Sequence, residues 1–345
     1  MNGNVKLGKW ACIITGVVAT LLASLAAADP WVTVGNPGND PDIRYEPPGY
    51  GSVAYEYRIS KYEVTAGEYR DFLNAVNPTG TDPYGLYNSR MDTTTDGSGC
   101  QITWNTSTLS YDFSGRPSGE EADWVNRPVN DVSWYDAIRF ANWKTSGNTE
   151  SGTYTITDGG PNSGTVTIPD HATLVPGQWF LPTEDEWYKA AYYDPNKPGG
   201  AGYWDYPTKS DTAPSNDLIN PDPGNNATFY DGGSTIGSPY YRTEVGAHEN
   251  SESPYGTFDQ GGNVWEWNET GSGSSRVLRG GSWCYTGADY LTASYRNDYD
   301  PWFEDVDLGF RLASPIPEPI SATFMGSAFV GIAVAAMRRR RKRRT

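Results

Sequence analysis

Histidine and cysteine are scarce in this sequence, which contains two of the first and three of the second in 345 residues. His171 and His248 stand in no His-x-x-x-His or His-carboxylate spacing, which excludes histidine-based zinc or non-haem iron chemistry, and in no Ser-His-Asp motif. Cys12 falls in an N-terminal apolar run, so only Cys100 and Cys284 remain for the body. Two thiols cannot build a metal-thiolate cluster, and we expect either one disulfide or two buried thiols.

Basic residues are also few between the two ends of the chain. Of the 26 Lys and Arg, two precede residue 29 and seven follow residue 337, which leaves 17 against 42 Asp and Glu, a net charge of about −25. This balance argues against binding nucleic acid or an anionic polymer. Calcium at a few carboxylate clusters is one interpretation of the acids, and a solvated acidic surface is the one that we prefer for most of them.

Residues 1–28 have the pattern of a secretory signal peptide. Lys6 and Lys9 precede an apolar run over residues 10–25, and three alanines before Asp29 provide a small-residue cleavage site. We therefore expect the mature chain to begin near Asp29.

Residues 315–345 have the three parts of a sorting tail. A Pro-Glu-Pro motif is followed by an uncharged stretch of 18 residues, 320–337, and by seven basic residues, 338–344. The motif is Pro317, Glu318 and Pro319. At about 1.5 Å per residue the uncharged stretch is long enough for a transmembrane helix, and the basic run stays on the cytoplasmic side. The tail resembles the PEP-CTERM signal of Gram-negative bacteria, which implies an exosortase partner and transit through the inner membrane to the cell surface or extracellular matrix. A simple membrane anchor is the alternative.

Residues 29–314 form one predicted domain, because no Pro/Ser-rich linker divides them. Three predicted helices begin with a capping residue followed three positions later by an acid, ahead of apolar residues at helical spacing. The three pairs are Thr65 and Glu68, Ser133 and Asp136, and Thr183 and Glu186. Alternation predicts a strand over residues 57–64 and a hairpin over residues 153–168.

The segments between these elements are rich in turn formers and aromatic residues. The chain has 39 Gly, 25 Pro, 13 Trp and 24 Tyr. This composition predicts little regular secondary structure and a domain held by buried aromatic rings and side-chain-to-backbone hydrogen bonds. It argues against disorder, which has few aromatic residues.

Five segments of the body carry a family resemblance: 132–137, 180–187, 261–267, 279–283 and 308–311. They include Gly-Gly-Asn-Val-Trp-Glu-Trp and Arg-Gly-Gly-Ser-Trp, and they resemble the domain of formylglycine-generating enzymes, also called sulfatase-modifying factors. The resemblance covers about residues 45–314. It implies an α+β domain with the irregular C-type-lectin-like fold of the formylglycine-generating-enzyme type and low regular secondary structure.

The sequence lacks the catalytic cysteine pair of the family that it resembles. Those enzymes oxidise a substrate cysteine with a pair in the pattern Arg-Gly-Gly-Ser-aromatic-x-Cys-x4-Cys, and here the two positions hold Tyr285 and Tyr290. Tyrosines offer neither a two-thiolate copper seat nor disulfide exchange, so we expect no catalytic residues and no copper. Cys284 is one residue early and would point to the opposite face of an extended segment. It is a catalytic candidate only under the enzyme alternative. Ser282 and Trp265 match positions that line the substrate groove of the family, which implies that the groove persists.

One glycine-rich loop is the candidate metal site. The resemblance maps a family Ca²⁺ site onto the Asp259 and Glu266 side chains and the Gly262 and Val264 carbonyls. Calcium takes six to eight oxygen ligands, and two glycines would let the loop turn its carbonyls inward. In the alternative interpretation Glu266 only accepts hydrogen bonds from backbone amides of the turn. A second family site would fall within residues 225–247, where the spacing assigns no ligands.

Three arginines lie among aromatic residues and next to Gly or Asn: Arg279, Arg296 and Arg311. We expect their guanidinium groups to tie irregular loops together through bonds to carboxylates and backbone carbonyls. Binding of an anionic ligand is the alternative.

These observations predict an exported, surface-sorted protein that is not a cysteine oxidase and that binds an extracellular glycan or peptide in the residual groove. One alternative is a formylglycine-generating oxidoreductase that acts on a sulfatase cysteine. Another is a structural matrix protein, which the lack of a pocket around Trp265 and Ser282 would favour.

The tail leads to a prediction about sorting. Replacing Pro317, Glu318 and Pro319 with alanine is expected to leave full-length protein in the inner membrane, because an exosortase would no longer find its motif. The native tail should be shortened and the body released to the surface. Cell fractionation with immunoblotting measures both. A native protein that keeps its Arg-rich end in cells that possess an exosortase would identify the tail as a permanent anchor.

Overall fold

The computed structural model describes residues 30–92, 98–116 and 119–316. The predicted signal peptide, residues 1–28, and the predicted membrane stretch, residues 320–337, lie outside the described residues. Within the described part of the chain, no helix is long and apolar enough to cross a membrane.

Three helices begin with the capping chemistry that the sequence predicts. In each, the N-cap hydroxyl accepts a bond from the N3 amide, and the N3 carboxylate accepts one from the N-cap amide. This arrangement satisfies backbone donors that a helix start leaves free, so all three capping boxes are confirmed. The α-helices are α2 (Ala66–Val76), α3 (Ala122–Val125), α4 (Trp134–Ser146) and α5 (Glu184–Tyr192), and the 3₁₀ helices are η1 (Ser89–Met91), η2 (His171–Thr173) and η3 (Ala288–Leu291).

The described strands form small, separate sheets. A three-stranded sheet joins the two ends of the domain, in the order β1 (Trp31–Val34), β2 (Tyr57–Ser60) and β13 (Ala313–Pro315). A four-stranded sheet has the order β11 (Asn297–Tyr299), β10 (Ser275–Arg279), β9 (Trp265–Ser272) and β12 (Leu308–Gly309). Three two-stranded sheets pair β3 (Thr103–Asn105) with β4 (Ser110–Asp112), β5 (Thr155–Gly160) with β6 (Ser163–Thr167), and β7 (Tyr193–Asp194) with β8 (Gly202–Tyr203).

Two strand predictions have different outcomes. The hairpin expected over residues 153–168 is present as β5 and β6. The strand expected over residues 57–64 ends at Ser60. Val64, the last residue of the predicted strand, instead bonds to two other segments. Its amide donates to Phe310 O at 2.9 Å, and its carbonyl accepts from the Val129 amide at 2.9 Å.

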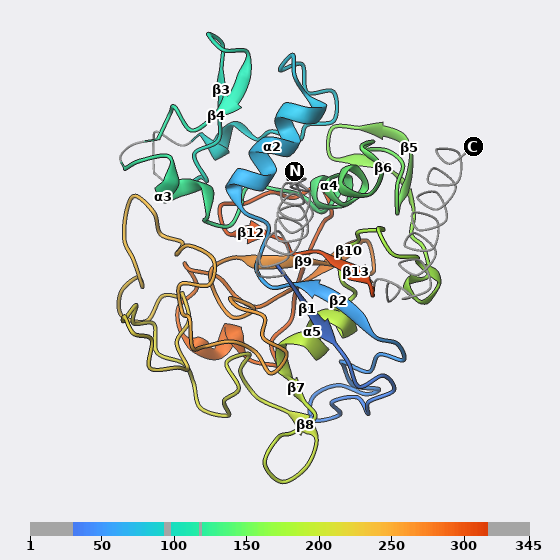
Figure 1. The fold of residues 1–345 in the computed structure, drawn as a ribbon, viewed down its shortest axis with the longest axis vertical. Helices are drawn as coiled ribbons and strands as arrows, with labels where there is room; N and C mark the ends of the chain where they lie inside the picture. The colour runs from blue at the N-terminus through green and yellow to red at the C-terminus, as the bar shows by residue number, and fades with distance from the viewer. Residues whose placement is uncertain (1–29, 93–97, 117–118, 317–345) are drawn as a thin grey trace, which may run out of the picture.

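The four-stranded sheet lies at the centre of the domain, with α2 and α4 on one side and α5 on the other (Figure 1). Aromatic rings fill the interface between the two upper helices and the chain near β12. Tyr69 and Phe72 of α2 pack against Phe140 of α4, and Tyr69 and Phe140 also pack against Phe310, with ring centroids between 5.3 and 6.5 Å apart. Short elements joined by long irregular segments and buried rings confirm the predicted α+β class with low regular secondary structure.

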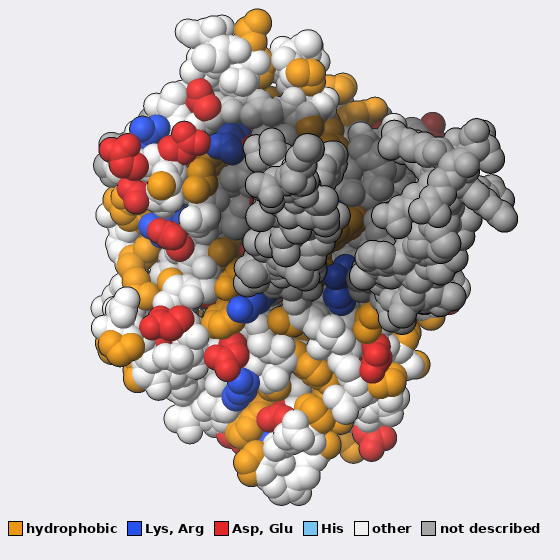
Figure 2. Space-filling view, in the orientation of Figure 1, with side chains coloured by type: hydrophobic (Ala, Val, Ile, Leu, Met, Phe, Trp, Pro, Cys, Tyr) orange, Lys and Arg blue, Asp and Glu red, His pale blue; other side chains and the backbone are white. Residues whose placement is uncertain are grey.

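On the face drawn in Figure 2, the described acidic side chains are not concentrated in one patch. Figure 2 shows carboxylates spread over the described surface of one face, several of them near Lys or Arg. Exposed pairs such as Arg44 with Asp205, at 2.6 Å, are of the kind that contributes little to stability. This distribution agrees with the interpretation of most acids as solvated surface groups.

His171 connects η2 to α5 and β9 through two carboxylates. Its Nδ1 lies 2.9 Å from Glu186 Oε2 and its Nε2 lies 2.9 Å from Glu269 Oε2, with all three side chains buried. Burial alone would lower the pKa of His171, but the two carboxylates outweigh this effect and raise the pKa to about 10. The fold therefore holds the charged imidazolium at neutral pH.

We predict that His171→Gln lowers the free energy of unfolding at pH 6 by about 3 kcal/mol or more, because it leaves two buried carboxylates without their cation. The pKa of about 10 in the fold exceeds the value of about 6.5 in an unfolded chain, so the charged form stabilises the fold. That contribution is complete below about pH 6.5 and is lost as the pH rises through about 10. The difference in melting temperature between wild type and variant should thus narrow from pH 6 to pH 10.

His248→Gln is the matched control. Burial lowers the pKa of His248, so the fold holds its neutral form and the difference in melting temperature should not narrow at high pH. An equal difference at both pH values for His171→Gln would contradict a charged His171.

Candidate functional site

Glu266, on β9, is fully buried and forms a bidentate ion pair with Arg311. The Arg311 Nε and Nη2 atoms each lie 2.6 Å from one carboxylate oxygen, and Trp187 Nε1 of α5 donates to Oε2 at 2.7 Å. Arg311 also donates to the carbonyls of Phe258, at 2.8 Å, and Ser60, at 3.2 Å. The pair thus joins five separate segments of the chain.

The other two arginines have the same kind of role. Arg279 is fully buried, and its Nε donates to Glu184 Oε1 at 2.8 Å, while Arg296 Nε lies 3.0 and 3.1 Å from the two oxygens of the same carboxylate. Arg279 Nη1 also donates to Ala293 O at 3.1 Å. The prediction that these guanidinium groups tie loops together is confirmed.

Several oxygens of the predicted calcium ligands already accept hydrogen bonds from other groups of the protein. Both Glu266 oxygens accept from Arg311, so its carboxylate does not fit as a ligand, nor does it bond backbone amides as the alternative expected. Asp259 Oδ2 accepts from the Gly246 amide at 2.5 Å, and the Gly262 and Val264 carbonyls belong to the same turn. Across residues 30–92, 98–116 and 119–316, no group of three or more His, Cys, Asp or Glu is arranged to hold a metal ion. Calcium binding stays a prediction.

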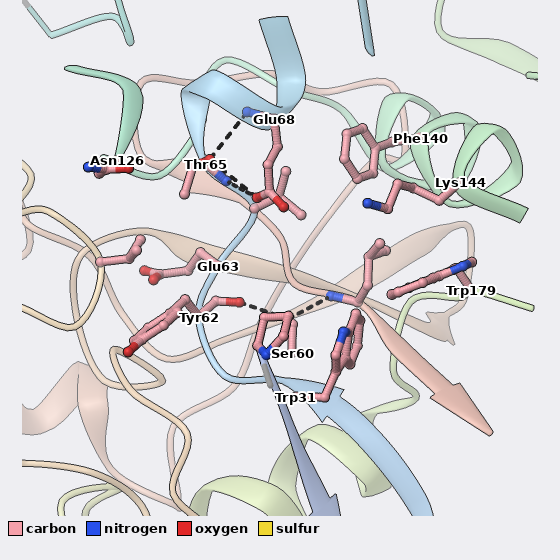
Figure 3. Close-up of a pocket in the computed structure, with 14 residues that line it drawn as sticks. Trp31, Ser60, Tyr62, Glu63, Thr65, Glu68, Asn126, Phe140, Lys144 and Trp179 are labelled. Atoms are coloured by element: carbon pink, nitrogen blue, oxygen red, sulfur yellow. Dashed lines mark hydrogen bonds between the residues drawn. The ribbon is translucent and has the colours of Figure 1, made fainter. Parts of the chain in front are cut away.

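A groove of about 520 Å³ opens beside the starts of β1 and α2 (Figure 3). Its apolar lining includes Trp31, Val64, Phe140, Trp179 and Leu312. Glu63 lies on one side and Lys144 on another (Figure 3). Burial and the Asp259 carboxylate raise the pKa of Glu63 well above its usual range, against the opposing effect of Arg311.

Glu63 is a residue that sequence reasoning missed. It is 2% exposed, and no described residue donates a hydrogen bond to its carboxyl oxygens. Its raised pKa favours the neutral, protonated form of the carboxyl over the charged form. The fold alone brings it near Asp259, which follows it by almost two hundred residues, so no local pattern could have revealed it. The groove contains none of the predicted site residues.

Tyr285 and Tyr290, at the two cysteine positions, pack over Trp265. Their ring centroids are 4.7 Å apart and lie 5.6 and 6.5 Å from that of Trp265, in edge-on arrangements. Trp265 and Ser282 are both fully buried. The residual groove expected at these two residues is therefore not open, because phenol rings cover the indole.

The two body cysteines do not form a disulfide, and Cys284 is exposed whereas Cys100 is buried. This corrects the expectation of a disulfide or two buried thiols. Cys284 Sγ lies 3.4 Å from Asp307 Oδ2, which also accepts from Ser282 Oγ at 2.8 Å. Desolvation and the Asp307 carboxyl raise the pKa of Cys284 to about 12, so the reactive thiolate is scarce at neutral pH.

The tyrosines continue into a longer aromatic surface, which we call the tyrosine row. Tyr290 packs on Tyr295 with centroids 4.7 Å apart, Tyr285 has a side-chain hydrogen bond with Tyr299, and Tyr299 stacks on Phe303 at 4.7 Å. All five members are partly buried and pack against the core. The last three were missed from the sequence, because only β10, η3 and β11 bring them beside the first two.

Solved structures to which the chain as a whole is similar include Treponema denticola variable protein 1, at 22% identity and a TM-score of 0.48 over 83% of this chain and 95% of that one. PvdO from Pseudomonas aeruginosa is 18% identical, with a TM-score of 0.46 over 83% of this chain and 91% of that one. In sequence, the chain is 32% identical to hercynine oxygenase of Mycolicibacterium thermoresistibile over 159 residues. That alignment covers 39% of this chain and 31% of the oxygenase, so the chain spans about a third of that relative.

The sulfatase-modifying factor enzyme 1-like domain model matches residues 32–316. This range contains the four-stranded sheet, the ion pair of Glu266 with Arg311, and the tyrosine row. Because the match spans most of the sequence, the protein belongs to the sulfatase-modifying factor enzyme 1-like domain family, and its fold is the irregular α+β fold of the formylglycine-generating-enzyme type.

Proposed function

We propose that this protein is a non-catalytic member of its family that binds an extracellular glycan or peptide through the tyrosine row. The observation that carries the proposal is the replacement of the two cysteines by Tyr285 and Tyr290, whose rings pack edge-on against each other and over Trp265. Phenol rings present an apolar face and a hydroxyl at low conformational cost, which suits recognition of ligands.

The burial of Trp265 and Ser282 favours the structural matrix alternative at that position, so a binding role requires a surface outside these two residues. A ligand would contact the partly exposed rings of Tyr285, Tyr290 and Tyr295 in place of a groove floor. These rings are held from below by the core and laterally by each other, so little side-chain freedom remains to be lost on binding. A rigid aromatic surface therefore supports recognition without requiring chemistry.

Oxygen chemistry is the second candidate, raised by the similarity to hercynine oxygenase. The thiol and the imidazole that could take part in oxygen chemistry are both in unfavourable environments. Cys284 is held as a thiol by a pKa of about 12, and both ring nitrogens of His171 contact carboxylates in the core. We therefore favour binding over oxidation.

The proposed setting is the cell surface or extracellular matrix. A signal peptide over residues 1–28 and a sorting tail over residues 315–345 support export, exosortase processing and transit through the inner membrane. The strongly acidic body supports a ligand that is not a nucleic acid or other polyanion. Calcium at the Asp259 loop is a further proposal, which the binding experiment below includes.

The first prediction of this proposal concerns activity. The purified protein should convert no cysteine of a Cys-x-Pro-x-Arg peptide to formylglycine, with or without copper, because neither tyrosine supplies a thiolate. Mass spectrometry of the peptide measures the conversion. A formylglycine mass shift that persists in Cys284→Ser would refute the non-catalytic assignment outright, and one that disappears would identify Cys284 as the active thiol.

The second prediction concerns the binding surface. On glycan and peptide arrays, the full chain in detergent should give a signal that Tyr290→Ala reduces by about tenfold, since the exposed part of one ring is lost from the contact. Tyr45→Ala is the matched control, because Tyr45 is partly buried in a different cluster and donates to Asp205 at 3.2 Å. Arrays with and without Ca²⁺ test the calcium proposal at the same time. Equal signals from Tyr290→Ala and wild type would contradict the tyrosine row as the binding surface.

A further inference from the structure

A hollow of about 620 Å³ lies at the end of the tyrosine row. Two aromatic residues form one wall: Phe303, which belongs to the row, and Trp302, which is 56% exposed. The remaining walls are mainly polar and come from η1, the β5–β6 turn and the segment before β12. They are Asn88, Arg90, Pro161, Asn162, Ser163 and Glu304. The hollow thus combines an apolar aromatic wall with a few polar groups, which is the composition of small-ligand sites.

The polar groups of this hollow are already fixed by the fold. Asn88 caps η1, with Oδ1 accepting from the Arg90 amide at 2.9 Å and Nδ2 donating to Glu304 Oε2 at 3.0 Å. Asn162 sits at the hairpin turn with a φ of 47°, and its Oδ1 lies 3.0 Å from Ser133 Oγ at the start of α4. Each carboxamide has two N–H donors and two lone pairs, so both keep bonding capacity for a ligand. Little reorganisation would accompany binding.

The hollow is close to electrically neutral. Arg90 Nη2 lies 2.9 Å from Asp305 Oδ1 and Arg90 Nε lies 3.6 Å from Asp131 Oδ1, so carboxylates compensate the charge of Arg90. Burial and the neighbouring Asp136 carboxyl raise the pKa of Glu304 to about 9, so Glu304 is protonated at neutral pH. Neither a strongly anionic nor a strongly cationic ligand would find an unpaired partner there.

These features match one class of ligand. A pyranose ring with equatorial hydroxyls turns axial C–H bonds to each face, which pack on an indole, while its edge presents vicinal hydroxyls as both donors and acceptors. Carboxamides are suited to such hydroxyl pairs, because each combines donor and acceptor in one plane. The continuation into Phe303 and Tyr299 provides a path for neighbouring units of a chain.

We propose that this hollow binds a neutral hexopyranose unit of β-gluco configuration, stacked on Trp302 and hydrogen-bonded by Asn88 and Asn162. The inference rests on the proposed function and deepens it by naming the ligand class and its anchoring residue. It assigns glycan recognition to Trp302, whereas the proposed function alone assigns binding to the tyrosine row.

The test uses saturation-transfer difference NMR on the full chain in detergent, with methyl β-D-glucopyranoside as the probe. Stacking predicts strongest transfer to the axial protons of one face, H1, H3 and H5. Methyl α-D-glucopyranoside, whose axial methoxy group at C1 lies on that same face, should bind more weakly. Trp302→Ala should raise the dissociation constant for the glucoside by about tenfold, through loss of the stacked apolar area.

Two further variants separate this effect from unfolding. Trp302→Phe keeps an aromatic face and should retain most of the binding. Trp204→Ala removes a partly exposed indole elsewhere, whose Nε1 donates to Asp194 at 3.1 Å, and should leave binding unchanged. A glucoside that binds equally to Trp302→Ala and wild type would overturn the inference.

The remaining outcomes distinguish the inference from the proposed function. If the glucoside does not bind but array ligands still depend on Tyr290, the hexopyranose site is wrong and the proposed function stands. If neither the glucoside nor any array ligand binds, both are wrong, and the structural matrix role is favoured.

Discussion

The rest of the structure depends on the buried ion pair between Glu266 and Arg311. Two charges without solvent exposure require nearly complete hydrogen bonding, and here the requirement is met by groups from α5, from the end of β2 and from the loop at Phe258. The pair therefore links these segments through side-chain bonds, and removing one partner would leave an uncompensated buried charge that costs about 3 to 5 kcal/mol.

Other buried charged side chains also connect irregular segments of the chain. Arg279 reaches Glu184 and the Ala293 carbonyl, and His171 joins α5 to β9. These contacts link separate segments, up to 98 positions apart, through charge-assisted bonds, which are stronger than neutral ones. A domain with short strands and long loops thus obtains from side chains the rigidity that a larger sheet would obtain from its backbone ladder.

How much the sequence predicts follows from the range of each interaction. Capping boxes, such as that of Ser133 with Asp136, involve residues three positions apart, so local pattern identified all three helix starts. The family resemblance also predicted the fold class. The role of Glu266 could not be predicted in the same way, because its partner Arg311 is 45 positions away. Arg311 donates to the carboxylate that was expected to bind calcium. The burial of Trp265 likewise depends on rings that only the fold assembles.

These contacts also explain how the cysteine positions could change without loss of the fold. The segment that carries Tyr285 and Tyr290 is anchored at its two sides by Arg279, whose guanidinium binds the Ala293 carbonyl, and by Ser282, whose hydroxyl binds Asp307. None of these bonds involves the side chains at the two cysteine positions. Larger aromatic residues there extend the packing above Trp265 and leave the anchoring bonds in place. The scaffold therefore separates stability from surface chemistry, and a surface that lacks the thiols of an oxidase keeps a rigid base beneath its aromatic rings.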